Sequence, residues 1–115
     1  MNNIYPTTFL ISSNDLSELE RDLEKAGIDC FKRVFGCYKG NKETSLCVLT
    51  DMQRTITSIA KKHKQESILK LDCTRHATLL FTDGKIVELG QWTCTGTNKP
   101  DGDYTFDGRQ YYTVK

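Results

Sequence analysis

Residues 35–49 read FGCYKGNKETSLCVL, a pattern typical of two β-strands joined by a tight turn. Apolar and β-branched residues lie toward both ends of this stretch, and a polar segment separates them. Gly40 and Asn41 are residue types that tolerate the positive φ angles of a hairpin turn. Tyr38 and Glu43 flank the turn, and this phenol and this carboxylate could point at a common ligand.

A strand and a helix are predicted before this hairpin, and a helix and a strand after it. β-branched and aromatic residues indicate a strand over 5–12, and leucines at helical spacing indicate a helix over 16–26 that ends at Gly27. Beyond the hairpin, an apolar stripe over 52–63 indicates a second helix, and 67–72 has strand character. The resulting βαββαβ order predicts an α+β fold, a ferredoxin-like sandwich.

Two capping patterns mark the predicted starts of the helices. Asp15 and Glu18 form a D-x-x-E pattern ahead of the first helix. Thr50 and Gln53 form a T-x-x-Q pattern ahead of the second. Both patterns predict that a side chain accepts a hydrogen bond from the first helical turn.

Two more β-hairpins are predicted toward the C-terminus. Residues 77–89 turn at Asp83–Gly84, and residues 104–114 turn at Asp107–Gly108. These additional C-terminal hairpins could extend the sheet or meet a neighbouring subunit, and either arrangement would shield exposed strand edges. A chain of 115 residues is expected to form one domain, spanning 1–115.

Composition excludes several classes of function. The net charge of +1 argues against nucleic acid and membrane surfaces as partners. The sequence has no apolar run of about 20 residues that could span a membrane. The segment Met1–Asn3 supplies no basic region before the first apolar run, so we expect no signal peptide and a cytoplasmic protein.

The metal-ligating residue types do not form a recognisable site. The five cysteines are scattered and include no C-x-x-C pair, which is typical of reduced thiols in the cytosol. His63 and His76 do not lie at ligand spacing from a cysteine. We therefore expect no bound metal.

Familiar catalytic motifs are absent from the sequence. It contains no G-x-S-x-G, G-x-x-x-x-G-K-[ST], G-x-G-x-x-G or H-E-x-x-H, so a serine nucleophile or a phosphate-binding loop has little support. Candidate polar groups remain at Gln65 and Glu66, after the second helix, and at Arg75 and His76, between two strands. Each of these residues, like the Tyr38–Glu43 pair, could instead be an ordinary solvated surface group.

Several segments occur in the same order as in a known enzyme family. They are GCY (36–38), ETSLCV (43–48), QESIL (65–69), TRHATLLF (74–81), ELGQW (88–92) and YTFDGRQYY (104–112). In this order the chain resembles the bacteriophage enzymes that degrade S-adenosylmethionine (SAM), now understood as SAM lyases and formerly called SAM hydrolases. The resemblance covers most of the chain from about residue 30 onward.

The resemblance implies a fold, a reaction and a set of site residues. It implies a PII-like subunit in a homotrimer, SAM bound between subunits, no cofactor, and conversion of SAM to 5′-methylthioadenosine and homoserine lactone. It implies catalytic roles for Tyr38 and Glu43, and substrate contacts for Gln65, Glu66 and Arg75. It also implies a phage anti-restriction role through depletion of SAM.

Alternatives remain open at this point. A non-enzymatic, PII-like module could bind a metabolite or inhibit a host protein. The aromatic residues of 104–112 could stack the bases of a single-stranded nucleic acid, although no RNA-recognition signature is present. The sequence also leaves open whether water or the carboxylate of SAM itself attacks.

Overall fold

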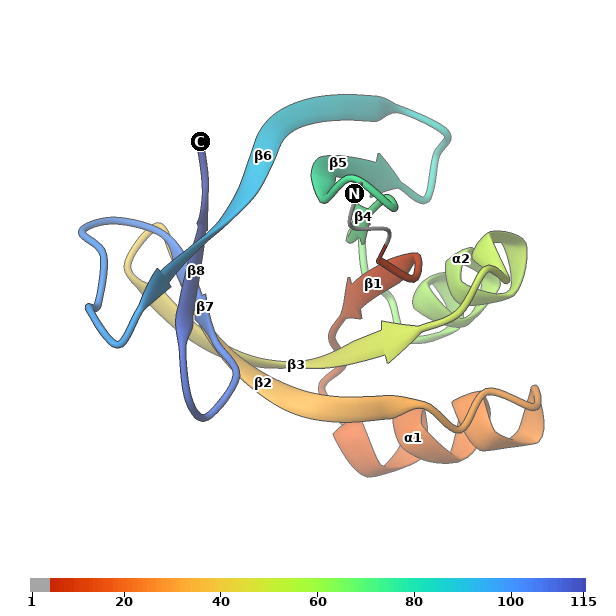
Figure 1. The fold of residues 1–115 in the computed structure, drawn as a ribbon. Helices are drawn as coiled ribbons and strands as arrows, with labels where there is room; N and C mark the ends of the chain where they lie inside the picture. The colour runs from red at the N-terminus through yellow and green to blue at the C-terminus, as the bar shows by residue number, and fades with distance from the viewer. Residues whose placement is uncertain (1–4) are drawn as a thin grey trace.

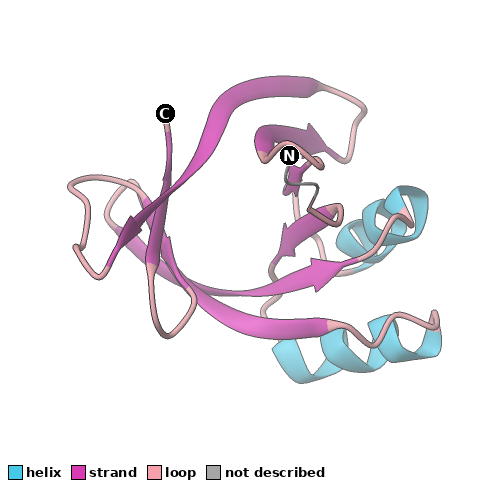
Figure 2. Ribbon diagram, viewed as in Figure 1, coloured by secondary structure: helices cyan, strands magenta, loops and turns pink. Residues whose placement is uncertain are grey.

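Antiparallel strands wrap into a closed barrel, and two helices lie against its outer face (Figures 1 and 2). This computed structural model describes residues 5–115. Met1–Asn3, on which the expectation of no signal peptide rests, lies outside the described residues. None of the helices in the described part is long and apolar enough to cross a membrane.

The described elements follow one another with short connections. They are β1 (Thr8–Ile11), α1 (Leu16–Lys25), β2 (Phe31–Tyr38), β3 (Asn41–Leu49), α2 (Gln53–Lys62), β4 (Ser67–Leu71), β5 (His76–Phe81), β6 (Ile86–Gly96), β7 (Tyr104–Phe106) and β8 (Tyr111–Val114). Around the barrel the order is β1-β3-β2-β7-β8-β6-β5-β4, and β4 pairs with β1 to close it.

The predicted ferredoxin-like (PII-like) sandwich is wrong, although its first six elements occur in the expected order. Strands β4, β1, β3 and β2 lie side by side, but their sheet does not end there. Strand β5 pairs with the free side of β4, and β7 pairs with the free side of β2. Strands β8 and β6 join these two additions. The C-terminal hairpins therefore satisfy both sheet edges within one chain, and the sheet closes into a barrel.

Alternating side chains give the strands β1 and β3 two different faces. Phe9 and Ile11 of β1 and Leu46 and Val48 of β3 are buried toward the helices. There they pack with Leu19 and Leu23 of α1 and with Ile56, Ile59 and Ala60 of α2. The residues between them face the inside of the barrel, because successive side chains of a strand point to opposite faces.

One predicted helix cap is confirmed and the other is wrong. The Asp15 carboxylate accepts a 3.0 Å hydrogen bond from the Glu18 N–H, and Gly27 has the positive φ of a residue just past a helix. At α2 the N-cap residue is Met52, which provides no side-chain cap. The Thr50 hydroxyl instead accepts a 3.1 Å hydrogen bond from the Met52 N–H. Thr50 therefore stabilises the turn between β3 and α2 and not the first turn of the helix.

The β2–β3 turn lies one residue earlier than the glycine–asparagine pair suggests. Positive φ angles occur at Lys39 and Gly40, and Asn41 already pairs with Tyr38 in the ladder. A two-residue turn of this kind needs positive φ at both central positions. The Asp103 carboxylate accepts a 2.7 Å hydrogen bond from the Lys39 N–H, which fixes Lys39 in this unusual conformation.

Candidate active site

The inside of the barrel holds a cavity of about 760 Å³. This volume falls within the ~300–1,000 Å³ range of small-molecule sites. Its wall combines apolar, hydroxyl, aromatic and charged side chains, and we call it the barrel cavity. It is lined by Leu10, Ser12, Tyr38, Lys39, Glu43, Ser45, Gln65, Ser67, Leu69, Leu79, Leu89, Trp92, Asp103, Tyr104, Thr105, Tyr112, Thr113 and Val114.

Strand periodicity places the polar lining residues on the inner face. Ser12 lies next to Ile11, Ser45 next to Leu46, and Ser67 next to Ile68, so each serine points away from the helix-covered core. Three hydroxyls, one just after β1 and the others on β3 and β4, therefore line the barrel cavity. Sequence reasoning missed these serines, although the alternation of buried and polar residues in β1, β3 and β4 is a signal for them.

Tyr38 lies at the end of β2 with its phenol held across the barrel wall. Its hydroxyl shares a 2.7 Å hydrogen bond with the Thr105 hydroxyl of β7. Burial raises the pKa of the Tyr38 phenol, and the nearby Glu43 and Asp103 carboxylates raise it further, whereas the bond to Thr105 acts in the opposite direction. The phenol is therefore neutral at pH 7 and can offer a hydrogen bond or the face of its ring.

Gly36 makes this orientation of Tyr38 possible. A Cβ atom at position 36 would lie 2.6 Å from Cε2 of the Tyr38 ring. Gly36 pairs with Glu43 of β3 on one side and with Thr105 of β7 on the other. The Tyr38 ring lies over Gly36, and its hydroxyl reaches the Thr105 hydroxyl. The missing side chain is thus a steric requirement of the site.

We predict that Gly36→Ala lowers the catalytic efficiency (kcat/KM) by about tenfold and destabilises the protein by ~1–3 kcal/mol, as overpacking does. The new methyl group would displace the Tyr38 ring and break its bond to Thr105. Steady-state kinetics and thermal unfolding measure the two effects. In a Tyr38→Ala background the same substitution should add little, because no ring remains to be displaced. A Gly36→Ala enzyme with wild-type kinetics and stability would contradict this account.

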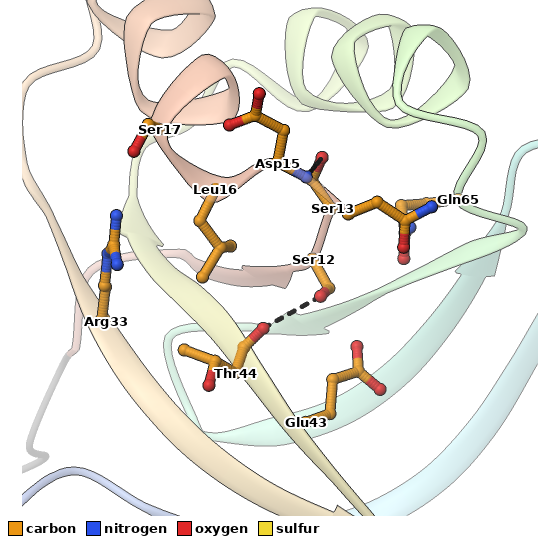
Figure 3. A pocket seen from close by; sticks show the side chains of 10 residues that line it. Ser12, Ser13, Asp15, Leu16, Ser17, Arg33, Glu43, Thr44 and Gln65 are labelled. Carbon is orange, nitrogen blue, oxygen red and sulfur yellow. Dashed lines mark hydrogen bonds between the residues drawn. The ribbon is translucent and has the colours of Figure 1, made fainter.

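Glu43 lies at the rim of the barrel cavity, where a second hollow begins. This outer hollow, of about 650 Å³, is lined by the start of α1 together with Arg33, Glu43, Thr44 and Gln65. Ser12, Glu43 and Gln65 line both spaces. Figure 3 shows the Glu43 and Gln65 side chains directed toward the same opening, with the Ser12 hydroxyl bonded to the Thr44 carbonyl at 3.0 Å.

The structure therefore brings together three of the five predicted site residues. Tyr38, Glu43 and Gln65 all line the barrel cavity. Within the described residues, Glu66 lines neither hollow, and its carbonyl oxygen accepts a 2.9 Å hydrogen bond from the Thr82 N–H. Arg75 lies at the β4–β5 turn, where its guanidinium donates a 2.9 Å hydrogen bond to the Thr8 hydroxyl. Their predicted substrate contacts stay predictions.

The charge of the barrel cavity suits a cationic ligand. Two carboxylates, Glu43 and Asp103, and one ammonium group, Lys39, are the charged side chains among its described lining residues. Among the same residues there is no histidine or cysteine. The site can therefore bind and orient a cation.

Aromatic side chains of the C-terminal strands complete the wall. Trp92 stacks on Tyr112 with 5.4 Å between ring centroids. The Tyr112 hydroxyl donates a 3.0 Å hydrogen bond to Asp107, and burial together with this carboxylate raises the pKa of Tyr112 to about 12. Sequence reasoning considered the tyrosines of 104–112 as base-stacking residues on an open sheet, but Tyr112 faces into the barrel cavity.

A closed barrel around a cavity of this size, lined by polar and aromatic side chains, is typical of proteins that bind small molecules. The model of the S-adenosylmethionine lyase family matches residues 12–115. The chain therefore belongs to the S-adenosylmethionine lyase family and is an enzyme that acts on SAM, which confirms the resemblance found in the sequence. A search of curated proteins gave no match.

Proposed function

We propose that this SAM lyase forms 5′-methylthioadenosine and homoserine lactone, with the carboxylate of SAM itself as the nucleophile. The observation that supports this is the barrel cavity, whose lining includes Tyr38, Glu43 and Gln65. SAM carries a sulfonium, an ammonium and a carboxylate group, so its net charge is positive. The excess of carboxylates in the cavity complements that charge.

The reaction needs a folded substrate more than it needs an enzymic nucleophile. A carboxylate oxygen of SAM attacks the γ-carbon, the bond from that carbon to sulfur breaks, and sulfur keeps the electron pair. One product is the neutral thioether methylthioadenosine, and the other is a five-membered lactone. Holding the two reacting atoms of one molecule in contact can supply much of the acceleration.

A partly apolar cavity favours this particular reaction. The positive sulfonium and the negative carboxylate neutralise each other as the new bond forms. Water stabilises the separated charges of the substrate more than the transition state, so removing water favours reaction. Leu10, Leu69 and Leu79 supply the apolar part of the cavity wall.

Three side chains receive roles in this proposal. The Glu43 carboxylate binds the α-ammonium group of SAM and thereby orients the carboxylate of the substrate. The face of the Tyr38 ring lies near the sulfonium, where a cation–π contact stabilises positive charge. The Gln65 amide hydrogen-bonds to the amino-acid part of the substrate from the other side of the rim.

Product analysis at early times tests the reaction. Purified enzyme is incubated with SAM, and the products are separated by chromatography and identified by mass spectrometry. Methylthioadenosine appearing together with homoserine lactone supports internal attack. In ¹⁸O-labelled water, direct attack of water on the γ-carbon would place one ¹⁸O in the side-chain hydroxyl of homoserine. That label, with no lactone detected at any time, would overturn the proposal.

The assembly is a further part of this proposal. An outer hollow of about 310 Å³ between Phe35, Tyr104, Phe106 and Tyr111 reaches Glu43 at the rim. A neighbouring subunit seated there would add groups next to Glu43, as the proposed homotrimer with shared sites requires. Light scattering of the purified protein tests this, and a monomer that cleaves SAM would contradict it.

The biological role follows from the reaction. An enzyme that depletes SAM would disable host methylation and SAM-requiring restriction, which is the proposed anti-restriction role in an infected bacterial cytoplasm. Expression in a host carrying a SAM-dependent restriction system should raise the plating efficiency of an unmodified phage. An unchanged plating efficiency, with SAM measurably depleted, would contradict this role.

A further inference from the structure

Three polar residues from separate parts of the chain form one continuous series of hydrogen bonds. The Ser13 hydroxyl lies 2.7 Å from Nδ1 of His63, and Nε2 of His63 lies 2.7 Å from Oδ2 of Asp22. Ser13 precedes α1, Asp22 lies on α1, and His63 is the C-cap residue of α2. The His63 side chain is 5% exposed, so the series is largely sheltered from water.

The order of these groups matches an activated nucleophile. An ionised Asp22 accepts the Nε2 proton, which leaves the lone pair of Nδ1 free to accept the proton of the Ser13 hydroxyl. Hydrogen bonds from His63 and Lys62 hold the pKa of the Asp22 carboxyl below its usual value, so it is ionised at neutral pH. A hydroxyl bonded to a base, with the base oriented by a third group, is the geometry of nucleophilic catalysis.

The hydroxyl end of this series lies at the substrate opening. Ser13 lines the outer hollow together with Glu43 and Gln65, which also line the barrel cavity (Figure 3). Its oxygen accepts a 3.0 Å hydrogen bond from the Asp15 N–H, and a hydroxyl oxygen keeps a second lone pair for attack.

The same hollow offers donors for a developing negative charge. Among the described residues, the N–H groups of Leu16 and Ser17 at the start of α1 have no hydrogen-bond acceptor, and both residues line the outer hollow. The N-terminus of a helix also carries partial positive charge. Free N–H donors beside a nucleophile can stabilise the oxyanion of a tetrahedral intermediate.

We propose that Ser13, His63 and Asp22 hydrolyse a small carboxylic ester, and that this ester is the lactone released at the adjoining barrel cavity. This inference rests on the proposed lactone product. Ser13 attacks the lactone carbonyl carbon as His63 takes the hydroxyl proton. The ring C–O bond breaks, and the ring oxygen receives that proton. Water, deprotonated by His63, then attacks the acyl-serine, and the proton returns to Ser13 as homoserine leaves. One water is consumed.

Homoserine lactone supplied directly, without SAM, tests this inference independently of the lyase reaction. The wild-type enzyme should form homoserine at least about tenfold faster than buffer alone, and Ser13→Ala should return the rate to that of buffer. Ser58→Ala, which removes an exposed hydroxyl from α2, serves as the matched control and should keep the wild-type rate. Melting temperatures establish that the variants are folded.

A second readout holds even if Ser13→Ala does not fold. A fluorophosphonate probe should modify the wild-type enzyme at Ser13, and homoserine lactone should protect that position, as peptide mass spectrometry would show. If the wild-type enzyme opens the lactone only at the rate of buffer, the inference is overturned. The hydrogen bonds of the three residues would then have only a structural role, in joining α1 to α2. If the enzyme opens added lactone but forms none from SAM, the hydrolytic role of Ser13, His63 and Asp22 is sustained, whereas the proposed lyase products and the proposed source of the lactone are overturned.

Discussion

Glu43→Gln is expected to lower kcat/KM for SAM by about 10²-fold while leaving the protein folded. Truncating one partner of a desolvated charge pair costs ~2–5 kcal/mol, and each ~1.4 kcal/mol is a factor of ten. Glu43 is exposed in the free enzyme, and the bound substrate would exclude water from its carboxylate. Glutamine keeps the shape of the side chain and removes the charge that binds the α-ammonium group.

The matched variant is Glu66→Gln, which removes the other predicted carboxylate. Because Glu66 lines neither hollow within the described residues, its loss should lower kcat/KM by less than about threefold, as for an exposed charge. Equal losses of kcat/KM in the two variants would mean that Glu66 also contacts the substrate, and SAM would then have to bind in a different arrangement. Full turnover by a folded Glu43→Gln enzyme would remove the central role proposed for Glu43.

Phe9→Ala is expected to lower the free energy of unfolding by ~3–5 kcal/mol. Phe9 is fully buried on β1, between Val48 of β3 and Lys70 of β4 in the ladder, and it belongs to the core that joins the barrel to both helices. The free energy of unfolding of a small domain is ~5–15 kcal/mol in total, so the cavity left by Phe9→Ala would remove a large share of it. Chemical denaturation measures the change.

Phe35→Ala provides the control of identical chemistry. Phe35 is 52% exposed on the outer face of β2 in the single subunit, so truncation in the dissociated subunit removes little buried surface and should cost about 1 kcal/mol or less. Similar losses for Phe9 and Phe35 would mean that Phe35 is buried in solution, for example by a second subunit. A loss below about 1 kcal/mol for Phe9→Ala would contradict the core described here.

Part of the site could be predicted from the sequence because it is local. Tyr38 and Glu43 flank one turn, and a two-residue turn at either 39–40 or 40–41 places them on the same face of the hairpin. Gln65 follows a helix that starts where the same strand β3 ends, so it returns to the neighbourhood of that strand. Thr105 could not be predicted, because it reaches Tyr38 only through the pairing of β2 with β7.

The sequence alone determined both helices, the three hairpins, the alternating faces of the strands and the family. These features depend on periodicity, turn residues and local order, which neighbouring residues specify directly. Closure of the sheet into a barrel depends on tertiary structure, because β2 must pair with β7, a strand far from it in the sequence, while β4 pairs with β5 at the other edge. Tertiary structure also placed His63 between Ser13 and Asp22, residues 50 and 41 positions away. No local pattern encodes such contacts, since they arise only when α1 and α2 pack on the same face of the barrel.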